Sequence, residues 1–179
     1  SLASFAILER AGSRRKLSEE EQKTFDKVRE RFDRICKAAY EKDVPIQVDA
    51  EESWIQDAID ELTTEMMAKY NKEKAIVYNT IQLYRHDRLA FLKEAFAKAN
   101  LEGYYLGVKL VRGAYMEKER ERAEERNYES PIHKTKEKSD RDYNLALDFC
   151  LENHPRIAVY AGTHNEHSCD YLTELMKEK

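Results

Sequence analysis

Polar and charged side chains follow four short apolar segments of the sequence, and these side chains are the best suited to chemistry. If the apolar segments are parallel strands, their carboxyl ends lie on one rim, where the active sites of parallel βα folds are found. A rim that served packing alone would not need an acid, an amide and cations together. In chain order these residues are Asp49, Gln82, Lys109, Arg112, Thr163, His164 and Asn165.

Lys109 is the most informative of these residues, because it stands inside the apolar run from Leu106 to Val111. A lysine in a strand that is covered on both faces loses hydration energy unless it meets an anion or a polar ligand. The alternative is that its ammonium group reaches the strand end and stays in water. The free-energy cost of burying an unpaired charge favours the functional interpretation.

Three other features carry less information. Asp49 precedes Ser53, the expected helix cap, so it belongs either to the rim or to an acidic helix start. Backbone N–H groups at Gly113 could hold an anion or a carbonyl oxygen of a bound molecule, or Gly113 could simply form a turn. His164 and His167 have the spacing of metal ligands on a helix, but no third ligand accompanies them, so no metal site is expected.

The segments that must position these residues alternate between helical and extended patterns. Ser18 and Glu21 form a capping box, and apolar residues, Ile35 among them, recur from Phe25 to Ala39 as one predicted buried stripe. The charged stretch at 117–138 includes a loop near 127–131, and Glu117–Arg120 is typical of a solvated helix face. Expected helices span 18–42, 53–70, 87–100, 139–152 and 165–179, and expected strands span 46–48, 75–78, 104–111 and 157–161.

This alternation predicts an α/β fold with parallel strands and helices outside them. Two architectures fit, an open doubly wound sheet and a (βα)8 barrel of ~250 residues. The chain has five glycines and neither GxGxxG nor GxxxxGK[ST], so no familiar nucleotide loop supports the open sheet. On the barrel interpretation, residues 1–179 form a single incomplete domain.

The composition excludes several classes of protein. A net charge of −4 gives no electrostatic support for nucleic-acid binding. Three cysteines far apart in the sequence fit a reducing compartment. No apolar run approaches the ~20 residues of a membrane span, and no signal peptide is visible.

Four ordered segments resemble motifs of the proline dehydrogenase family. They are Val48–Glu52, Tyr78–Tyr84, Lys109–Tyr115 and Gly162–Asn165, and the resemblance covers residues 45–179. Many bacterial members carry arginine at the position of Lys109. With lysine there, the sequence resembles the monofunctional or eukaryote-like members of the family. The resemblance implies part of a (βα)8 TIM-type barrel, with the strands here as about strands three to six. The family's substrate-carboxylate motifs on strand two and the last helix are not found, so this chain alone is not expected to be active.

The resemblance also implies a role for each matching residue. Asp49 and Lys109 would be catalytic, Asp49 orienting the polar network and Lys109 donating near flavin N5. Tyr115 would pack beside the substrate. The residues that would bind FAD are Ala50, Gln82, Arg112, Gly113, Ala114, Thr163, His164 and Asn165.

The implied activity is the first step of proline catabolism. L-proline would be oxidised to 1-pyrroline-5-carboxylate by hydride transfer from C5 to flavin N5, and a membrane quinone would accept the electrons. The implied location is the bacterial cytoplasm or the mitochondrial matrix, with peripheral contact at the inner membrane.

Two rival interpretations come from the residues themselves. A lysine in a barrel strand can form a Schiff base with a carbonyl substrate, as aldolases do. A non-catalytic interaction fragment with charged helices is the other rival, and it leaves the polar rim unexplained.

Overall fold

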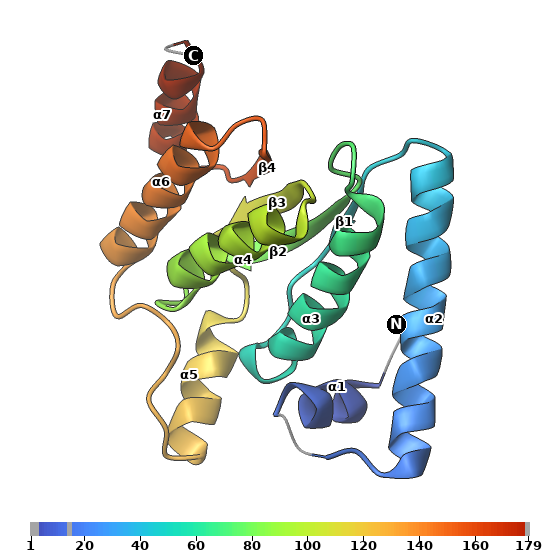
Figure 1. The fold of residues 1–179 in the computed structure, drawn as a ribbon. Coiled ribbons are helices and arrows are strands. Elements are labelled where there is room, and N and C mark those ends of the chain that lie inside the picture. Colours follow the sequence, from blue (N-terminus) through green and yellow to red (C-terminus); the bar gives the residue numbers. More distant parts are fainter. Residues whose placement is uncertain (1–3, 14–15, 178–179) are drawn as a thin grey trace.

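The computed structural model describes residues 4–13 and 16–177, whose strands form one parallel sheet (Figure 1). Helices connect the strands on one side of the sheet, as in the wall of a (βα) barrel. In the register, Thr80 lies beside Lys109, and Gln82 lies beside Val111. In sequence and spatial order the strands are β1 (Ile46–Val48), β2 (Val77–Gln82), β3 (Leu106–Val111) and β4 (Ile157–Gly162).

The helices form a layer against the sheet and a second layer outside it. α3, α4 and α6 pack on the strands, α1 and α2 pack on α3, and α7 packs on α6. Across the described ranges, none of these helices combines the length and the apolar character that crossing a membrane requires. The helices are α1 (Phe5–Gly12), α2 (Glu19–Glu41), α3 (Ser53–Tyr70), α4 (Arg88–Glu102), α5 (Met116–Glu125), α6 (Lys136–Glu152) and α7 (Glu166–Lys177).

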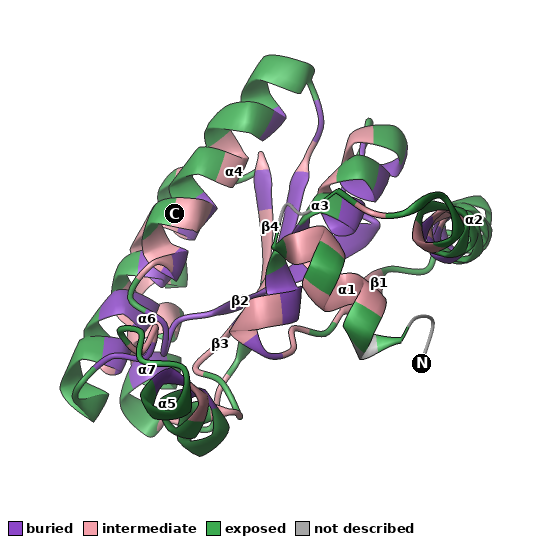
Figure 2. Ribbon diagram, turned by 90° about the horizontal axis from the view of Figure 1, so that it is seen from below, coloured by how far each residue is buried: buried purple, intermediate pink, exposed green. Residues whose placement is uncertain are grey.

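The apolar core lies between the sheet and the inner helices. Ile81, Val108 and Leu110 belong to this core and are at most 1% exposed. They alternate along β2 and β3 with Thr80 and Lys109, which line a cavity on the other face. Figure 2 shows that buried residues gather on the strands and on the helix faces turned toward them. The period of two therefore places Ile81, Val108 and Leu110 in the core and Thr80 and Lys109 at the cavity.

The structure confirms the predicted α/β class, the parallel strands and most element positions. The capping box is present, with Ser18 Oγ accepting from the Glu21 amide at 3.3 Å and the Glu21 carboxylate accepting from the Ser18 amide at 2.9 Å. α3 runs over the predicted range from Ser53 to Tyr70. Local sequence signals therefore locate the elements that carry the rim.

Several features differ from the sequence prediction. α1 falls outside the predicted helices, α6 begins at Lys136, and Ile35 of the predicted buried stripe is exposed. β2 spans Val77–Gln82 and not 75–78, and its buried Asn79 amide donates to the Asp60 carboxylate at 2.7 Å. Glu119 lies in a predicted solvated face but is fully buried. Its carboxylate accepts from the Ser53 amide at 2.6 Å and from the Ser53 hydroxyl at 2.7 Å, which compensates for the lost hydration.

Candidate active site

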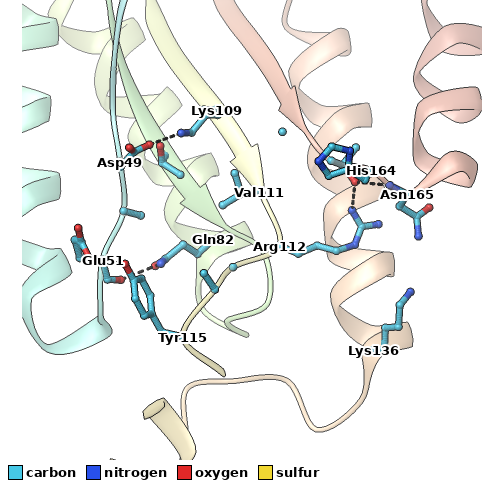
Figure 3. A pocket seen from close by; sticks show the side chains of 16 residues that line it. Asp49, Glu51, Gln82, Lys109, Val111, Arg112, Tyr115, Lys136, His164 and Asn165 are labelled. Atoms are coloured by element: carbon cyan, nitrogen blue, oxygen red, sulfur yellow. Dashed lines mark hydrogen bonds and ion pairs between the residues drawn. The ribbon is translucent and has the colours of Figure 1, made fainter. Parts of the chain in front are cut away.

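A cavity of about 590 Å³ opens at the carboxyl ends of the four strands (Figure 3). Every residue that the sequence analysis assigns to the rim lines this cavity, although these residues come from four separate strand ends. The predicted lining residues are Asp49, Ala50, Gln82, Lys109, Arg112, Gly113, Ala114, Tyr115, Thr163, His164 and Asn165. Glu51, Thr80, Val111, Lys136 and Gly162 complete the lining.

Lys109 forms an ion pair with Asp49 across the width of β2. The Lys109 side chain is 20% exposed, whereas that of Asp49 is 79% exposed. Thr80, the β2 neighbour of Lys109, donates its hydroxyl to the Val48 carbonyl at 2.7 Å and so ties β2 to the end of β1. Lys109 thus meets an anion at the rim, as its position in an apolar strand predicts.

Gln82 brings an amide to the floor of the cavity. Its side chain is 2% exposed, and Nε2 donates to the Glu51 carbonyl at 2.9 Å. Oε1 is buried and makes no hydrogen bond to the part of the chain that the structure describes. An unpaired buried acceptor loses free energy, so a donor from a bound molecule would stabilise it.

Arg112 links the end of β3 to α6 and to the start of α7. Its guanidinium donates to Asp140 at 2.6 Å, to Thr163 at 2.7 Å and to Ser168 at 2.9 Å, and it lies 4.3 Å from the centroid of the Tyr143 ring. Burial raises the pKa of Asp140, but hydrogen bonds from Lys136 and Arg112 outweigh this effect and leave the pKa below its ordinary value. The guanidinium is therefore fixed in orientation by several partners.

Tyr115 and Glu51 both line the cavity and contact each other. The Tyr115 hydroxyl donates to the Glu51 carboxylate at 2.6 Å. This hydrogen bond, with a smaller contribution from burial, raises the pKa of Tyr115 to about 12. The shift therefore extends the pH range in which the phenol is a donor from about pH 10 to about pH 12.

Gly113 has a backbone conformation that other residues rarely adopt, with φ at 138°. A Cβ atom there would lie 2.4 Å from the Tyr84 ring, so the loop can pass over Tyr84 only with glycine at this position. The Tyr84 amide donates to the Arg112 carbonyl at 2.8 Å and holds the loop in place. Gly113 thus keeps backbone at the cavity wall without a side chain.

Thr163 and Asn165 build the turn that enters α7. Thr163 Oγ1 accepts from the Asn165 amide at 3.1 Å, and Asn165 Oδ1 accepts from the Ser168 amide at 3.0 Å. The Asn165 side chain therefore caps α7, and His164 between them is exposed and lines the cavity. Residues 4–13 and 16–177 contain no cluster of three or more His, Cys, Asp and Glu side chains placed to hold a metal ion.

The sequence prediction does not include two charged residues that line the cavity, Glu51 and Lys136. Glu51 stands in the run of acids before α3, which is typical of a helix start. Lys136 begins α6 after a long charged stretch, and its ammonium donates to Asp140 at 2.5 Å. Only the fold brings Lys136 near the ends of β3 and β4.

Comparisons with known proteins give the chain a family. The pattern of the family described as "Proline dehydrogenase" matches residues 3–179. A relative named "Proline dehydrogenase 1, mitochondrial" from Drosophila melanogaster is 38% identical over 168 residues, which is 88% of this chain and 25% of the relative. Its namesake from Caenorhabditis elegans is 41% identical over 167 residues, covering 90% of this chain and 27% of the relative. The chain thus spans about a quarter of the length of these relatives.

Solved structures show the same fold. A crystal structure of proline utilization A from Bdellovibrio bacteriovorus, inactivated by N-propargylglycine, superposes with a TM-score of 0.81 at 24% identity. The match covers 88% of this chain and 16% of that one, and it supports a TIM-barrel-like arrangement of the strands. From the extent of the family match and the identities to its named members, this chain belongs to the proline dehydrogenase family.

Proposed function

We propose that the protein oxidises L-proline to 1-pyrroline-5-carboxylate with FAD bound at the carboxyl ends of its strands. The observation that carries this proposal is the convergence of Asp49, Gln82 and Lys109 on one cavity from three different strand ends. Residues 1–179 would then supply about strands three to six of one larger barrel domain. Because the chain spans a quarter of its relatives' length, the complete substrate site would include residues outside this range.

The cavity lining suits a flavin. Gln82 Oε1 is a buried acceptor without a partner among the described residues, and a flavin ring presents an N–H group that could donate to it. Lys109 and Arg112 bring positive charge, which suits an anionic cofactor. Gly113 leaves backbone uncovered along the wall, where a ring or a phosphate can approach closely. We assign Ala50, Ala114, Thr163, His164 and Asn165 to the same cofactor surface.

The chain's own groups would position the reactants and balance charge. Bound FAD supplies the acceptor for a hydride from proline C5, while the nitrogen lone pair completes the new C=N bond. Lys109 and Arg112 oppose the negative charge that reduction brings into the cavity. Asp49 holds Lys109 in place through their ion pair. Tyr115 is held in place by its hydrogen bond to Glu51 and would pack beside the substrate.

The electron acceptor and the location follow from the same proposal. A membrane quinone would take the electrons, with peripheral contact at the inner membrane. The names of the Drosophila and Caenorhabditis relatives place those proteins in mitochondria, which supports the mitochondrial matrix for this one, and the bacterial cytoplasm is the alternative. The Schiff-base rival fits the geometry less well, because Lys109 is engaged as the cationic partner of Asp49.

A single-turnover measurement tests the proposal. The full-length protein should retain FAD, and proline should bleach its visible absorbance without oxygen. Lys109→Ala should slow bleaching by ~100-fold, because one preorganised charge is lost, with a smaller effect on FAD retention. Lys98→Ala on α4 is the matched control, because Lys98 pairs with Glu102 on the surface of the helix, away from the cavity. Bleaching at the normal rate in Lys109→Ala would refute the role given to Lys109.

A further inference from the structure

A buried polar network lies on the helix side of β2, behind the cavity. The Asp60 carboxylate accepts from Arg88 at 2.8 Å, from Asn79 at 2.7 Å and from Gln56 at 2.9 Å. All four side chains are buried, and Gln56 is 0% exposed. They come from α3, β2 and α4, so the network joins three elements.

The same network reaches the loop that carries Asp49. Gln56 Oε1 accepts from the Glu51 amide at 2.8 Å, and the Glu51 carbonyl accepts from Gln82 Nε2 at 2.9 Å. The hydrogen bonds therefore run from Asp60 through Gln56 to the backbone N–H of Glu51, and from the carbonyl of the same residue to Gln82. Asp49 and Ala50 immediately precede Glu51 in the loop.

The orientation of the Gln56 amide is fixed by its partners. Because an ionised Asp60 can only accept, the NH₂ group of Gln56 must face it, and the oxygen must then face the Glu51 amide. Asp60 is itself held by Arg88, which stacks on the Phe91 ring with its guanidinium carbon 3.8 Å from the ring centroid. A buried polar network of this size is not expected to make the fold more stable than apolar side chains of similar volume would. We infer that its role is to specify one geometry.

We propose that Gln56, held by the buried Asp60–Arg88 pair, is a positioning residue for the site. It fixes the backbone of Glu51 on its N–H side, and through that residue it sets the place of Asp49 and the direction of the Gln82 amide, which donates to the Glu51 carbonyl. The part of this proposal that concerns catalysis rests on the proposed function. The part that concerns the loop stands on the hydrogen bonds alone.

The test compares Gln56→Met with Thr63→Val in the full-length protein. Methionine keeps the length of the side chain but can neither accept from the Glu51 amide nor donate to Asp60, and Asp60 keeps two donors. Thr63 is a matched control, because it is also 0% exposed on α3 and donates only to the backbone, at the Ile59 carbonyl. Hydrogen exchange of the Glu51 amide and anaerobic bleaching of FAD by proline are measured in both variants.

We expect Glu51 exchange to be about tenfold faster in Gln56→Met, as loss of one hydrogen bond allows. Bleaching should slow by ~10- to 100-fold, as displacement of a reacting group by about 1 Å would cause. Thr63→Val should change neither rate. If Gln56→Met matches Thr63→Val in both measurements, the proposal is wrong, and faster exchange with unchanged bleaching would overturn its catalytic part.

Two further outcomes separate this proposal from the proposed function. If proline does not bleach the unsubstituted protein, the proposed function fails, while Glu51 exchange still decides whether Gln56 holds the loop. If Gln56→Met does not fold, exchange in the unsubstituted protein decides. A Glu51 amide as slow as amides in the core of β3 then supports the proposal, and one that exchanges at the rate of open loops refutes it.

Discussion

At the scale of single residues, hydrogen bonds in the site shift the pKa values of a few groups away from their ordinary values. The bond to Glu51 raises the pKa of Tyr115, and the bonds from Lys136 and Arg112 lower the pKa of Asp140. Each of these groups can be titrated, so each gives a prediction that does not depend on enzymatic activity.

Replacing Glu51 by glutamine should lower the pKa of Tyr115 from about 12 toward its ordinary value of 10.0, because the Glu51 carboxylate is the main cause of the shift. Nuclear magnetic resonance of ¹³C-labelled tyrosine measures this pKa directly. Since the folded pKa is raised, Tyr115 contributes stability below pH 10 that disappears between about pH 10 and 12. Glu117→Gln, at an exposed residue, is the control, and an unchanged Tyr115 titration in Glu51→Gln would contradict the account.

Asp140→Asn should lower the free energy of unfolding at pH 7 by roughly 0.5–1 kcal/mol, since Asp140 is partly exposed. The pKa of Asp140 is depressed in the folded state, so its contribution is present above the unfolded value of 3.8 and is lost as the pH falls below it. Urea unfolding across this pH range measures the difference. The effect of Asp140→Asn on the free energy of unfolding should disappear at acid pH and should exceed that of Asp57→Asn, on the exposed surface of α3. Failure of either expectation would argue against a stabilising role of the ion pairs that Asp140 forms with Arg112 and Lys136.

The sequence predicts the residues of the site better than their partners. Lys109 and Gln82 are found because polar groups at the ends of apolar strands share a rim. The pairing of Lys109 with Asp49 depends on reaching across β2, and no local pattern encodes that distance. Lys136 is missed because lysines are common in the charged stretch around it, and only folding selects one of them.

At the scale of elements, the Glu119 carboxylate of α5 caps the N-terminus of α3. The side chain of the N-cap residue, Glu52, makes no capping hydrogen bond to α3, and the buried Glu119 carboxylate from α5 accepts from Ser53 instead. Lys118 and Arg122 of α5 lie over the Trp54 ring of α3, with the Arg122 guanidinium carbon 4.1 Å from its centroid. The loop between β3 and α5, which carries Tyr115, is therefore anchored at its far end.

Glu119→Ala should lower the free energy of unfolding by about 1–3 kcal/mol, because the Ser53 amide and hydroxyl lose their acceptor at the positive end of α3. Chemical denaturation measures the change. Glu117→Ala on the exposed side of α5 should stay within ~0.5 kcal/mol. Equal effects of the two substitutions would mean that Glu119 does not cap α3.

Elements are predictable where local signals are strong and are missed where packing creates them. α2 begins at its capping box, as predicted, but Ile35 in its apolar stripe is 45% exposed, because α2 packs on its neighbours along a narrow side. α1 has eight residues and no side-chain cap at Ser4, too little to form a helix unaided. It packs on α3, so its stability is tertiary and leaves no local sequence signal.

At the scale of the whole molecule, the cavity is assembled from residues between positions 49 and 165. Any ligand that fills it must bridge the ends of all four strands and stabilise the folded state over the unfolded chain. The barrel fold explains this arrangement, since parallel strands in sequence order place their carboxyl ends together.

Addition of FAD at 100 times its dissociation constant should therefore raise the free energy of unfolding of the full-length protein by about 2.7 kcal/mol. The thermal midpoint should rise by several degrees. Gln82→Met removes the unpaired amide acceptor and should reduce the shift, whereas Thr63→Val should retain it. A midpoint that does not respond to FAD would contradict cofactor binding.

The most direct measurement of the central claim is a crystal structure of the full-length protein with FAD bound. We expect a flavin ring at the carboxyl ends of the strands, in hydrogen-bond contact with the Gln82 amide and beside Lys109 and Arg112. A flavin bound elsewhere, for example in the acidic cavity between α3 and α4 that Asp57, Glu61 and Glu94 line, would contradict it.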